Sequence, residues 1–321
     1  MKKIRNAAAL IALCVSAIFA GGASAAGFPE KDITFVIPYG PGGGFDTYVR
    51  KFAPEIEKFL PNKVNVVPKN IGGGGGRKAL SQVWRAKPDG YTISIFNMPG
   101  MALDKILDKK ANFDIAGFTW LSKLAHSPYV LAVGSKGKYK TFKQLQAAKG
   151  LKYAVTSPSS TSYVAGKILG AATGLDIKFL PGYKGSSAIS LSLIRGDTDL
   201  SLFADNSFGK YAKSGDIIGV LSLDETSPMK GIPSLNDIGK PELAALATER
   251  MVGGPPGMAP EIVKILETAI MKAGASKPIQ DWAKSTDQVI KPTDAAGAKT
   301  RVENILGFYS KYKDVLAAKQ K

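Results

Sequence analysis

Few residues in this sequence could carry out catalysis or bind a metal ion, and they do not form catalytic or metal-binding motifs. His126 is the only histidine and Cys14 the only cysteine among the 321 residues. A metal site needs clustered His, Cys or carboxylate ligands, and the sequence shows no such cluster. Ser127 beside His126 allows a serine hydrolase on paper, but no G-x-S-x-G elbow is present. We therefore predict no enzyme activity, no metal and no cofactor, with a structural role for His126.

A glycine-rich turn, "IPYGPGGGFDTYVR" at 37–50, is the stretch best suited to binding a ligand. It places Gly42, Gly43 and Gly44 between an apolar run and a helical pattern, and Asp46 follows. Turns of this kind bind anions through backbone N–H groups at the start of the helix. The turn lacks both the Lys-Ser/Thr ending of a P-loop and the G-x-G-x-x-G dinucleotide spacing. The pattern therefore predicts an anion other than nucleotide phosphate.

A second glycine turn lies in "KNIGGGGGRKALSQVW" at 69–84, where glycines 72–76 again lead into a helical pattern. Arg77 directly follows the glycines. An arginine there could clamp a carboxylate in bidentate fashion, because its planar fork matches the two oxygens. It could equally be a solvated charge at the helix end.

Several side chains near these turns could contact a ligand or serve only the fold. Tyr39 could pack over a ligand or take part in ordinary packing. Asp46 could bind an amine or ordered water, or it could bind the unpaired N–H groups at the start of the helix. The hydroxyl-rich turn at 156–162 could donate to an anion or cap the helix that follows, and its candidate side chains are Thr156, Ser160 and Ser162.

The N-terminus and the composition indicate an exported protein. Basic residues at 2–5 precede an apolar run at 7–20, and Ala23-Ser24-Ala25 fits the small-x-small cleavage rule. We expect residues 1–25 to be a signal peptide and the mature protein to be soluble and exported. The formal net charge of +17 favours anionic ligands or partners. The lysines are scattered and no aromatic-basic motif is present, so we expect no nucleic acid partner.

The elements that must position these residues alternate between strand and helix patterns. Apolar runs at 33–37, 64–67 and 91–95 predict strands, and each of the first two is followed by a glycine turn and a helical pattern. Pro54 falls inside the first helical pattern and should kink or restart that helix. This alternation predicts an α/β fold with mostly parallel sheets, whose ligands bind at the carboxyl ends of the strands.

Three segments together carry a resemblance to a known family: "FPEKDITFVIPYGPGGGFDTYVRKFA", "NIGGGGGRKALSQVWRAKPDGYTI" and "YKGSSAISLSLIRGDTDLSLF". In their order and spacing they resemble the periplasmic solute receptors of tripartite tricarboxylate transporters, the Bug family. The resemblance implies a two-lobed binding protein of type II-like architecture, with a mostly parallel sheet flanked by helices in each lobe. Residues 26–126 plus 250–321 are predicted to form lobe 1 and residues 127–249 lobe 2, with the ligand cleft between them.

The resemblance also implies how the ligand is held. In such receptors the two glycine turns bind a carboxylate through backbone N–H groups and bridging waters, and the second lobe reads the distal end. We accordingly predict backbone donors at Gly42, Gly43, Gly44, Gly73, Gly74, Gly75 and Gly76. Asn97 and Asp205 are further predicted side-chain contacts. The sequence departs from the family pattern at Gly72, Ala79, Gly182 and Ala204, the last two beside second-lobe ligand segments.

The predicted function is therefore a monomeric periplasmic receptor for a small organic carboxylate, either a dicarboxylate or an aromatic acid. It would deliver the ligand to the membrane subunits of a transporter by closing around hinges near 126–128 and 248–252. One alternative keeps the fold and makes the receptor the partner of a sensor kinase. The remote alternative is an exported serine hydrolase using His126.

Overall fold

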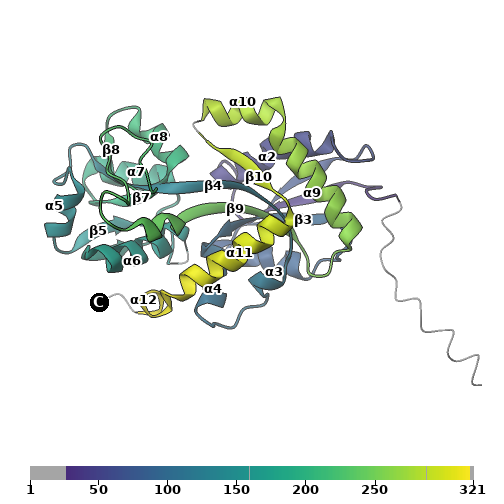
Figure 1. Ribbon diagram of the computed structural model, residues 1–321, viewed down its shortest axis with the longest axis horizontal. Coiled ribbons are helices and arrows are strands. Elements are labelled where there is room, and N and C mark those ends of the chain that lie inside the picture. The colour runs from purple at the N-terminus through teal and green to yellow at the C-terminus, as the bar shows by residue number, and fades with distance from the viewer. Residues whose placement is uncertain (1–26, 159, 287, 319–321) are drawn as a thin grey trace, which may run out of the picture.

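Residues 27–158, 160–286 and 288–318 are described by the computed structural model, except for the side chains of 205, 206 and 210 (Figure 1). The predicted signal peptide at 1–25 lies outside the described residues. Within them, no helix is both long enough and apolar enough to cross a membrane. The expected α/β class is confirmed, because strands and helices alternate along most of the described chain.

The larger sheet has the strand order β10-β4-β9-β3-β1-β2. β1 pairs with β2 and β3 in parallel. The first glycine turn follows β1, and the second follows β2. The pairs β3–β9, β9–β4 and β4–β10 are antiparallel. The strands are β1 Ile33–Ile37, β2 Val66–Asn70, β3 Thr92–Met98, β4 Thr119–Gly134, β9 Ala247–Gly254 and β10 Ile290–Thr293.

Helices cover both faces of this sheet, which explains why β1 is apolar and buried at every position except Thr34. One face packs against α2 Gly44–Glu57, α9 Pro260–Ala275 and α10 Lys277–Ser285. The other face packs against α3 Arg77–Trp84, α4 Leu103–Ile106 and α11 Ala295–Ser310. Short 3₁₀ turns lie at Gly74–Gly76, Gly100–Ala102, Ile115–Gly117 and Pro241–Ala245, and α12 Lys313–Ala317 follows α11.

A second group of strands forms around the far end of β4. There β4 pairs in antiparallel fashion with β7 and β8, while β5 and β6 pair in parallel. A bridge between Tyr153 and Leu200 joins the two sets. The elements are α5 Phe142–Ala147, β5 Leu151–Ala154, α6 Thr161–Thr173, β6 Ile177–Leu180, α7 Ser186–Arg195, β7 Ser201–Ala204, α8 Asp205–Ala212 and β8 Ile217–Ser222.

Strands β4 and β9 run between the two groups of strands, as Figure 1 shows. They form one antiparallel ladder in which His126 pairs with Glu249 and Pro128 with Ala247. The predicted lobe boundaries at 126/127 and 249/250 fall inside this two-stranded ladder rather than in loops. The division into lobes at these residues stays a prediction.

Two expectations for local structure are wrong in part. Of the two alternatives for Pro54, a restart of the helix is excluded, because α2 runs from Gly44 to Glu57 with the proline inside it, and a kink stays a prediction. Phe52 and Ile56 on either side of the proline are buried in the core, and their packing offsets the lost hydrogen bond. The second strand begins at Val66 rather than at 64, since the Asn65 N–H donates to the Asp32 carboxylate instead.

Candidate functional site

A cleft of about 1110 Å³ lies between the carboxyl end of β1 and the N-terminus of α7. From the larger sheet and its helices it is lined by 39–45, Thr47, Tyr48, Asn97, Trp282, Ser285, Thr286 and Gln288. From the second group of strands it is lined by Thr156, 184–188, Ser207, Gly209, Tyr211 and Lys213. The first glycine turn therefore lies where a ligand could contact both halves of the protein.

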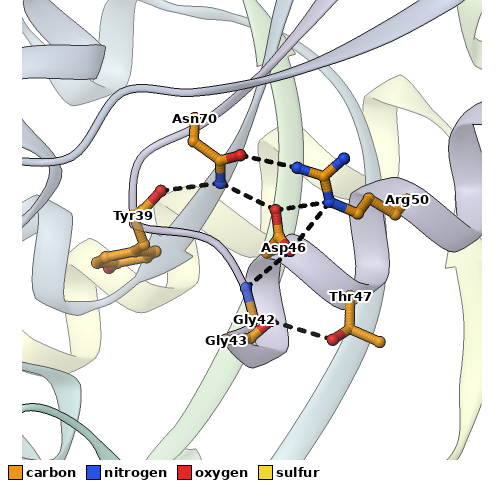
Figure 2. Close-up of polar contacts among 7 residues, drawn as sticks. All are labelled: Tyr39, Gly42, Gly43, Asp46, Thr47, Arg50 and Asn70. Carbon is orange, nitrogen blue, oxygen red and sulfur yellow. Dashed lines mark hydrogen bonds and ion pairs between the residues drawn. The ribbon is translucent and has the colours of Figure 1, made fainter.

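Asp46 holds the first glycine turn in place (Figure 2). Its carboxylate accepts a 2.9 Å hydrogen bond from the Gly42 N–H and a 2.9 Å bond from Asn70 Nδ2. Arg50 Nε lies 3.0 Å from both of its oxygens. Only 4% of Asp46 is exposed, and it does not line the cleft. Of the two roles that the sequence allowed, this geometry favours binding backbone N–H groups.

The pKa of Asp46 is lowered from its ordinary value of 3.8. Burial by itself would raise it, but the hydrogen bonds from Arg50, the Gly42 N–H and Asn70 outweigh burial. Because the folded pKa lies below the unfolded one, these bonds stabilise the fold fully above about pH 4, and this stabilisation disappears as the pH falls through the folded pKa.

We expect Asp46→Ala to lower the free energy of unfolding by about 2–3 kcal/mol at pH 7, because it removes a buried acceptor that the Gly42 N–H, Asn70 and Arg50 share. Urea unfolding of the two proteins measures the difference, which should shrink in acid below about pH 4. Thr47→Ala is the matched control, since Thr47 Oγ1 donates only to the Gly43 carbonyl in an exposed setting. A loss below about 0.5 kcal/mol for Asp46→Ala would contradict the role of Asp46 in the turn.

The same turn leaves backbone donors unused at the start of α2. In the part of the chain that the structure describes, the N–H groups of Gly43, Gly44 and Phe45 have no hydrogen-bond acceptor. Gly43 is the N-cap residue and provides no side-chain oxygen. A Cβ on Gly42 or Gly43 would meet nothing within 4 Å, so the turn faces open space. Free N–H groups and the helix dipole give this end of α2 the donors and the positive field that suit an anion.

The second glycine turn lies beside the first but does not line the cleft. A Cβ on Gly72 would lie 3.7 Å from the Gly40 nitrogen. The residues Gly73, Gly74, Gly75 and Gly76 all have positive φ angles. Arg77 is bound to Asp104 through Nε and Nη2 at 2.6 and 2.8 Å, so its fork already holds a carboxylate of the protein itself. The predicted contacts of this turn with a ligand stay predictions.

Tyr39 and Asn97 line the cleft and take part in a polar chain that reaches the second group of strands. Asn97 Nδ2 donates to the Tyr39 hydroxyl at 2.9 Å, and Thr161 Oγ1 on α6 donates to Asn97 Oδ1 at 2.8 Å. Burial raises the pKa of Tyr39 to about 12, although the bond from Asn97 lowers it. The Tyr39 hydroxyl therefore stays protonated at neutral pH and can donate a hydrogen bond to a ligand.

Among the predicted residues of the hydroxyl-rich turn, only Thr156 lines the cleft. Ser160 is the N-cap of α6 and accepts a bond from the Tyr163 N–H. Ser162 lies 3.3 Å from Ser160 through their hydroxyl oxygens. Position 159 and the side chain of Asp205 lie outside the described residues, so the prediction for Asp205 stays as it was.

Several cleft residues were missed by the sequence reasoning. Helix α7 begins at the cleft after Gly185, its N-cap, so a second helix N-terminus faces the first turn. Lys184 and Lys213 add positive charge on the same side. The quoted segment "YKGSSAIS" contained Lys184 and the start of α7, and it could have identified them. Nothing in the sequence pointed to Trp282, whose ring packs edge-on against Tyr48 at 4.9 Å.

His126 and Ser127 contact different partners. His126 Nδ1 lies 2.6 Å from Glu249 Oε1, and Ser127 Oγ accepts a 2.8 Å bond from Arg250 Nη1. Neighbouring side chains on a strand point to opposite faces, which explains the separation. The geometry therefore does not pair Ser127 with His126 as a nucleophile and base. In residues 27–318, outside the gaps at 159 and 287, no three His, Cys, Asp or Glu side chains converge as metal ligands.

Comparisons with known proteins agree with this architecture. Residues 49–293 match the model of the tripartite tricarboxylate transporter family receptor. Protein BugT of Bordetella pertussis is 25% identical over 291 residues, which cover 87% of each chain. A Rhodopseudomonas palustris protein solved with adipate has a TM-score of 0.78 at 22% identity, over 90% of this chain and 98% of that one. MatC of the same organism, solved with bound malate, has a TM-score of 0.77 at 20% identity, over 90% of this chain and all 100% of that one.

Proposed function

The chain belongs to the tripartite tricarboxylate transporter receptor family, and on this premise we propose that it binds a small organic carboxylate in the cleft. Family and fold are those of periplasmic solute-binding receptors. In the proposed cycle the protein binds its ligand in the periplasm, closes around it and delivers it to the membrane subunits of a transporter. The predicted signal peptide at 1–25 fits this location.

The observation that carries the proposal is the set of unused N–H groups at the start of α2. Gly43, Gly44 and Phe45 leave three backbone donors unused in the first turn of α2 among the described residues, and a carboxylate has the charge and lone pairs to accept them. Gly42 does not contribute, because Asp46 already accepts its N–H. The Tyr39 hydroxyl and Asn97 lie at the edge of the same place and supply uncharged polar contacts.

The opposite wall of the cleft supports a ligand with polar groups at both ends. Lys184, Lys213 and the N-terminus of α7 give that wall a positive charge, and the hydroxyl of Ser187 bonds that of Tyr211 at 3.0 Å. A second carboxylate or another acceptor would complement this wall. Adipate and malate, the ligands of the two structural neighbours, both have two carboxylates.

Closure around the ligand would use the β4–β9 ladder as its hinge. Among the described residues, only these paired strands, near Ser127 and Thr248, join the two groups of strands within one ladder. Thr248 Oγ1 donates to the Tyr129 hydroxyl at 2.8 Å, so side chains also link the ladder there. Small changes of φ and ψ on both strands would tilt one half of the protein toward the other. No contact in the described residues favours the sensor-kinase alternative.

We expect adipate or malate to raise the melting temperature of the purified protein, whereas adipamide and malamide should not. The carboxylate accepts the N–H groups of α2, and the neutral amides of nearly the same shape lack the charge that makes these bonds strong. Saturation at 100 times the dissociation constant would add about 2.7 kcal/mol to the free energy of unfolding. Thermal unfolding measures the shift in melting temperature, and calorimetric titration measures the dissociation constant.

Well-folded protein that responds to none of a panel of mono-, di- and aromatic carboxylates would overturn the proposed function. Equal responses to adipate and adipamide would contradict the role of the anion site at α2. A response to aromatic acids alone would keep the function and reject a second carboxylate as the distal group.

A further inference from the structure

Arg250 on β9 is a buried cation without a carboxylate partner among the residues that the structure describes. Only 4% of the residue is exposed, and its Nη1 donates to the Ser127 hydroxyl. Its Nε is buried and has no hydrogen-bond partner. Among the described residues no Asp or Glu oxygen lies within 4 Å of its guanidinium, whereas buried arginines are ordinarily paired. Its neighbour Glu249 binds His126 and Arg301 instead.

The guanidinium lies directly beneath the anion site at α2. Its Nη2 is 3.8 Å from the point where a Cβ on Gly44 would sit. Its Cζ lies 4.4 Å from the centre of the Tyr48 ring and 5.2 Å from that of Phe45. Gly44, Phe45 and Tyr48 all line the cleft, so the cation lies directly behind residues of this wall. On β3, Asn97 pairs in register with Arg250, and Asn97 also lines the cleft.

We propose that Arg250 is a charge-specificity residue, whose missing counterion is the carboxylate that binds at the start of α2. This inference rests on the proposed function and extends it, because it names what selects a charged ligand over a neutral one. Hydrogen bonds to the N–H groups of Gly43, Gly44 and Phe45 would admit any good acceptor. The buried charge behind them adds an attraction that only an anion experiences.

The size of the effect follows from charge separation. The apo protein keeps an unpaired charge in a poorly solvated place, which is unfavourable, and an anionic ligand offsets part of this cost. At an effective dielectric constant of about 20, opposite charges roughly 6–8 Å apart change a binding constant by about 30- to 100-fold. Contacts with the Phe45 and Tyr48 rings and the bond to Ser127 hold the guanidinium in place, so little reorganisation is needed when the ligand binds.

The sharpest test supplies Arg250 with a counterion from the side away from the cleft. Ser127→Asp places a carboxylate where the Ser127 hydroxyl now accepts from Nη1, and Ser127→Asn has the same shape without the charge. Relative to Ser127→Asn, we expect Ser127→Asp to melt at a higher temperature and to bind adipate at least tenfold more weakly. The comparison within the pair cancels the packing cost of the larger side chain. Calorimetry measures the affinity and thermal unfolding the stability.

A second test removes the charge itself. Arg250→Gln should weaken adipate binding by about 30-fold or more, whereas Arg250→Lys should recover most of it by restoring the charge. A third measurement needs no variant: in the intact protein, the assigned Nε–H resonance of Arg250 should shift on addition of adipate and stay in place with adipamide.

The outcomes separate the two proposals. If the intact protein binds no carboxylate, the proposed function fails, and the role of Arg250 fails with it. If it binds adipate and the two Ser127 variants bind with equal affinity, the role of Arg250 alone is overturned. Should neither Ser127 variant fold, an Nε–H resonance that does not respond to adipate overturns it instead.

Discussion

Gly43→Asp is expected to abolish carboxylate binding and at the same time to stabilise the unliganded protein slightly. Gly43 is the N-cap of α2, and its φ of −84° and ψ of 170° suit any L-residue. Its Cβ would project into open space. Aspartate is among the best N-cap residues, so its carboxylate would accept the N–H groups that the structure leaves unused. The variant would thus bind its own carboxylate where the ligand should bind.

The substitution is expected to weaken ligand binding and to increase the stability of the fold. Affinity for adipate should fall at least about 100-fold, because the tethered carboxylate competes at a high effective concentration and repels a second negative charge. The free energy of unfolding should rise by roughly a few tenths of a kcal/mol, the usual difference between aspartate and glycine at an N-cap. Calorimetric titration and urea unfolding measure the two effects.

Gly43→Ala is the matched control for this substitution. It adds the same Cβ without an acceptor, so binding should stay within about tenfold of the original while the helix loses up to roughly 1 kcal/mol. Unchanged adipate binding by a folded Gly43→Asp protein would refute the anion site at the start of α2, whatever the role of Arg250.

Glu249→Ala is expected to cost about 3–5 kcal/mol of folding free energy, the largest loss of stability that we predict. Glu249 is 1% exposed and accepts bonds from His126 Nδ1 at 2.6 Å and Arg301 Nε at 2.8 Å. These partners come from β4 and α11, so the carboxylate joins two strands and a helix beside the predicted hinge. Its removal leaves the Arg301 guanidinium and the His126 ring without an acceptor and opens a cavity.

The acid dependence of this effect follows from the pKa of Glu249. Burial raises that pKa, but the hydrogen bond and charge of His126, together with Arg301, lower it below its ordinary value of 4.5. The stabilisation is therefore present above about pH 4.5 and is lost as the pH falls through the folded pKa. Urea unfolding at pH 7 and again in acid tests this, with Glu249→Gln as the isosteric, uncharged comparison. A loss below about 1 kcal/mol at pH 7 for Glu249→Ala would contradict the prediction.

Asp46 and Arg77 show how much of the candidate site could be predicted from the local sequence pattern. The spacing of Asp46 after three glycines identified a helix start and left two roles open, and the bond from the Gly42 N–H favours one of them. Arg77 has the right position for a carboxylate clamp, but Asp104 occupies its fork. Asp104 lies 27 residues away in sequence, so no local pattern could reveal the pair.

The partners of the buried charges Glu249 and Arg250 could not be predicted from the local sequence. Glu249 and Arg250 are adjacent in the sequence and would be taken for a neutral surface pair. On a strand they point to opposite faces, so Glu249 binds His126 and Arg301 while Arg250 lies beneath the cleft. Which face of β9 each residue occupies depends on the pairing of β9 with β3 and β4, and that pairing is set by contacts more than 100 residues apart.

By itself, the sequence determined the α/β class, the family and the first glycine turn, because glycine runs, capping residues and apolar periodicity act over a few residues. The tertiary structure alone decided which donors stay free, which charges are paired and which distant side chains complete the cleft. Trp282 and Lys213 line the cleft, and Arg250 lies behind its wall, only because the chain folds back on itself. Hydrogen bonds and charges depend on distance in space rather than on distance along the chain.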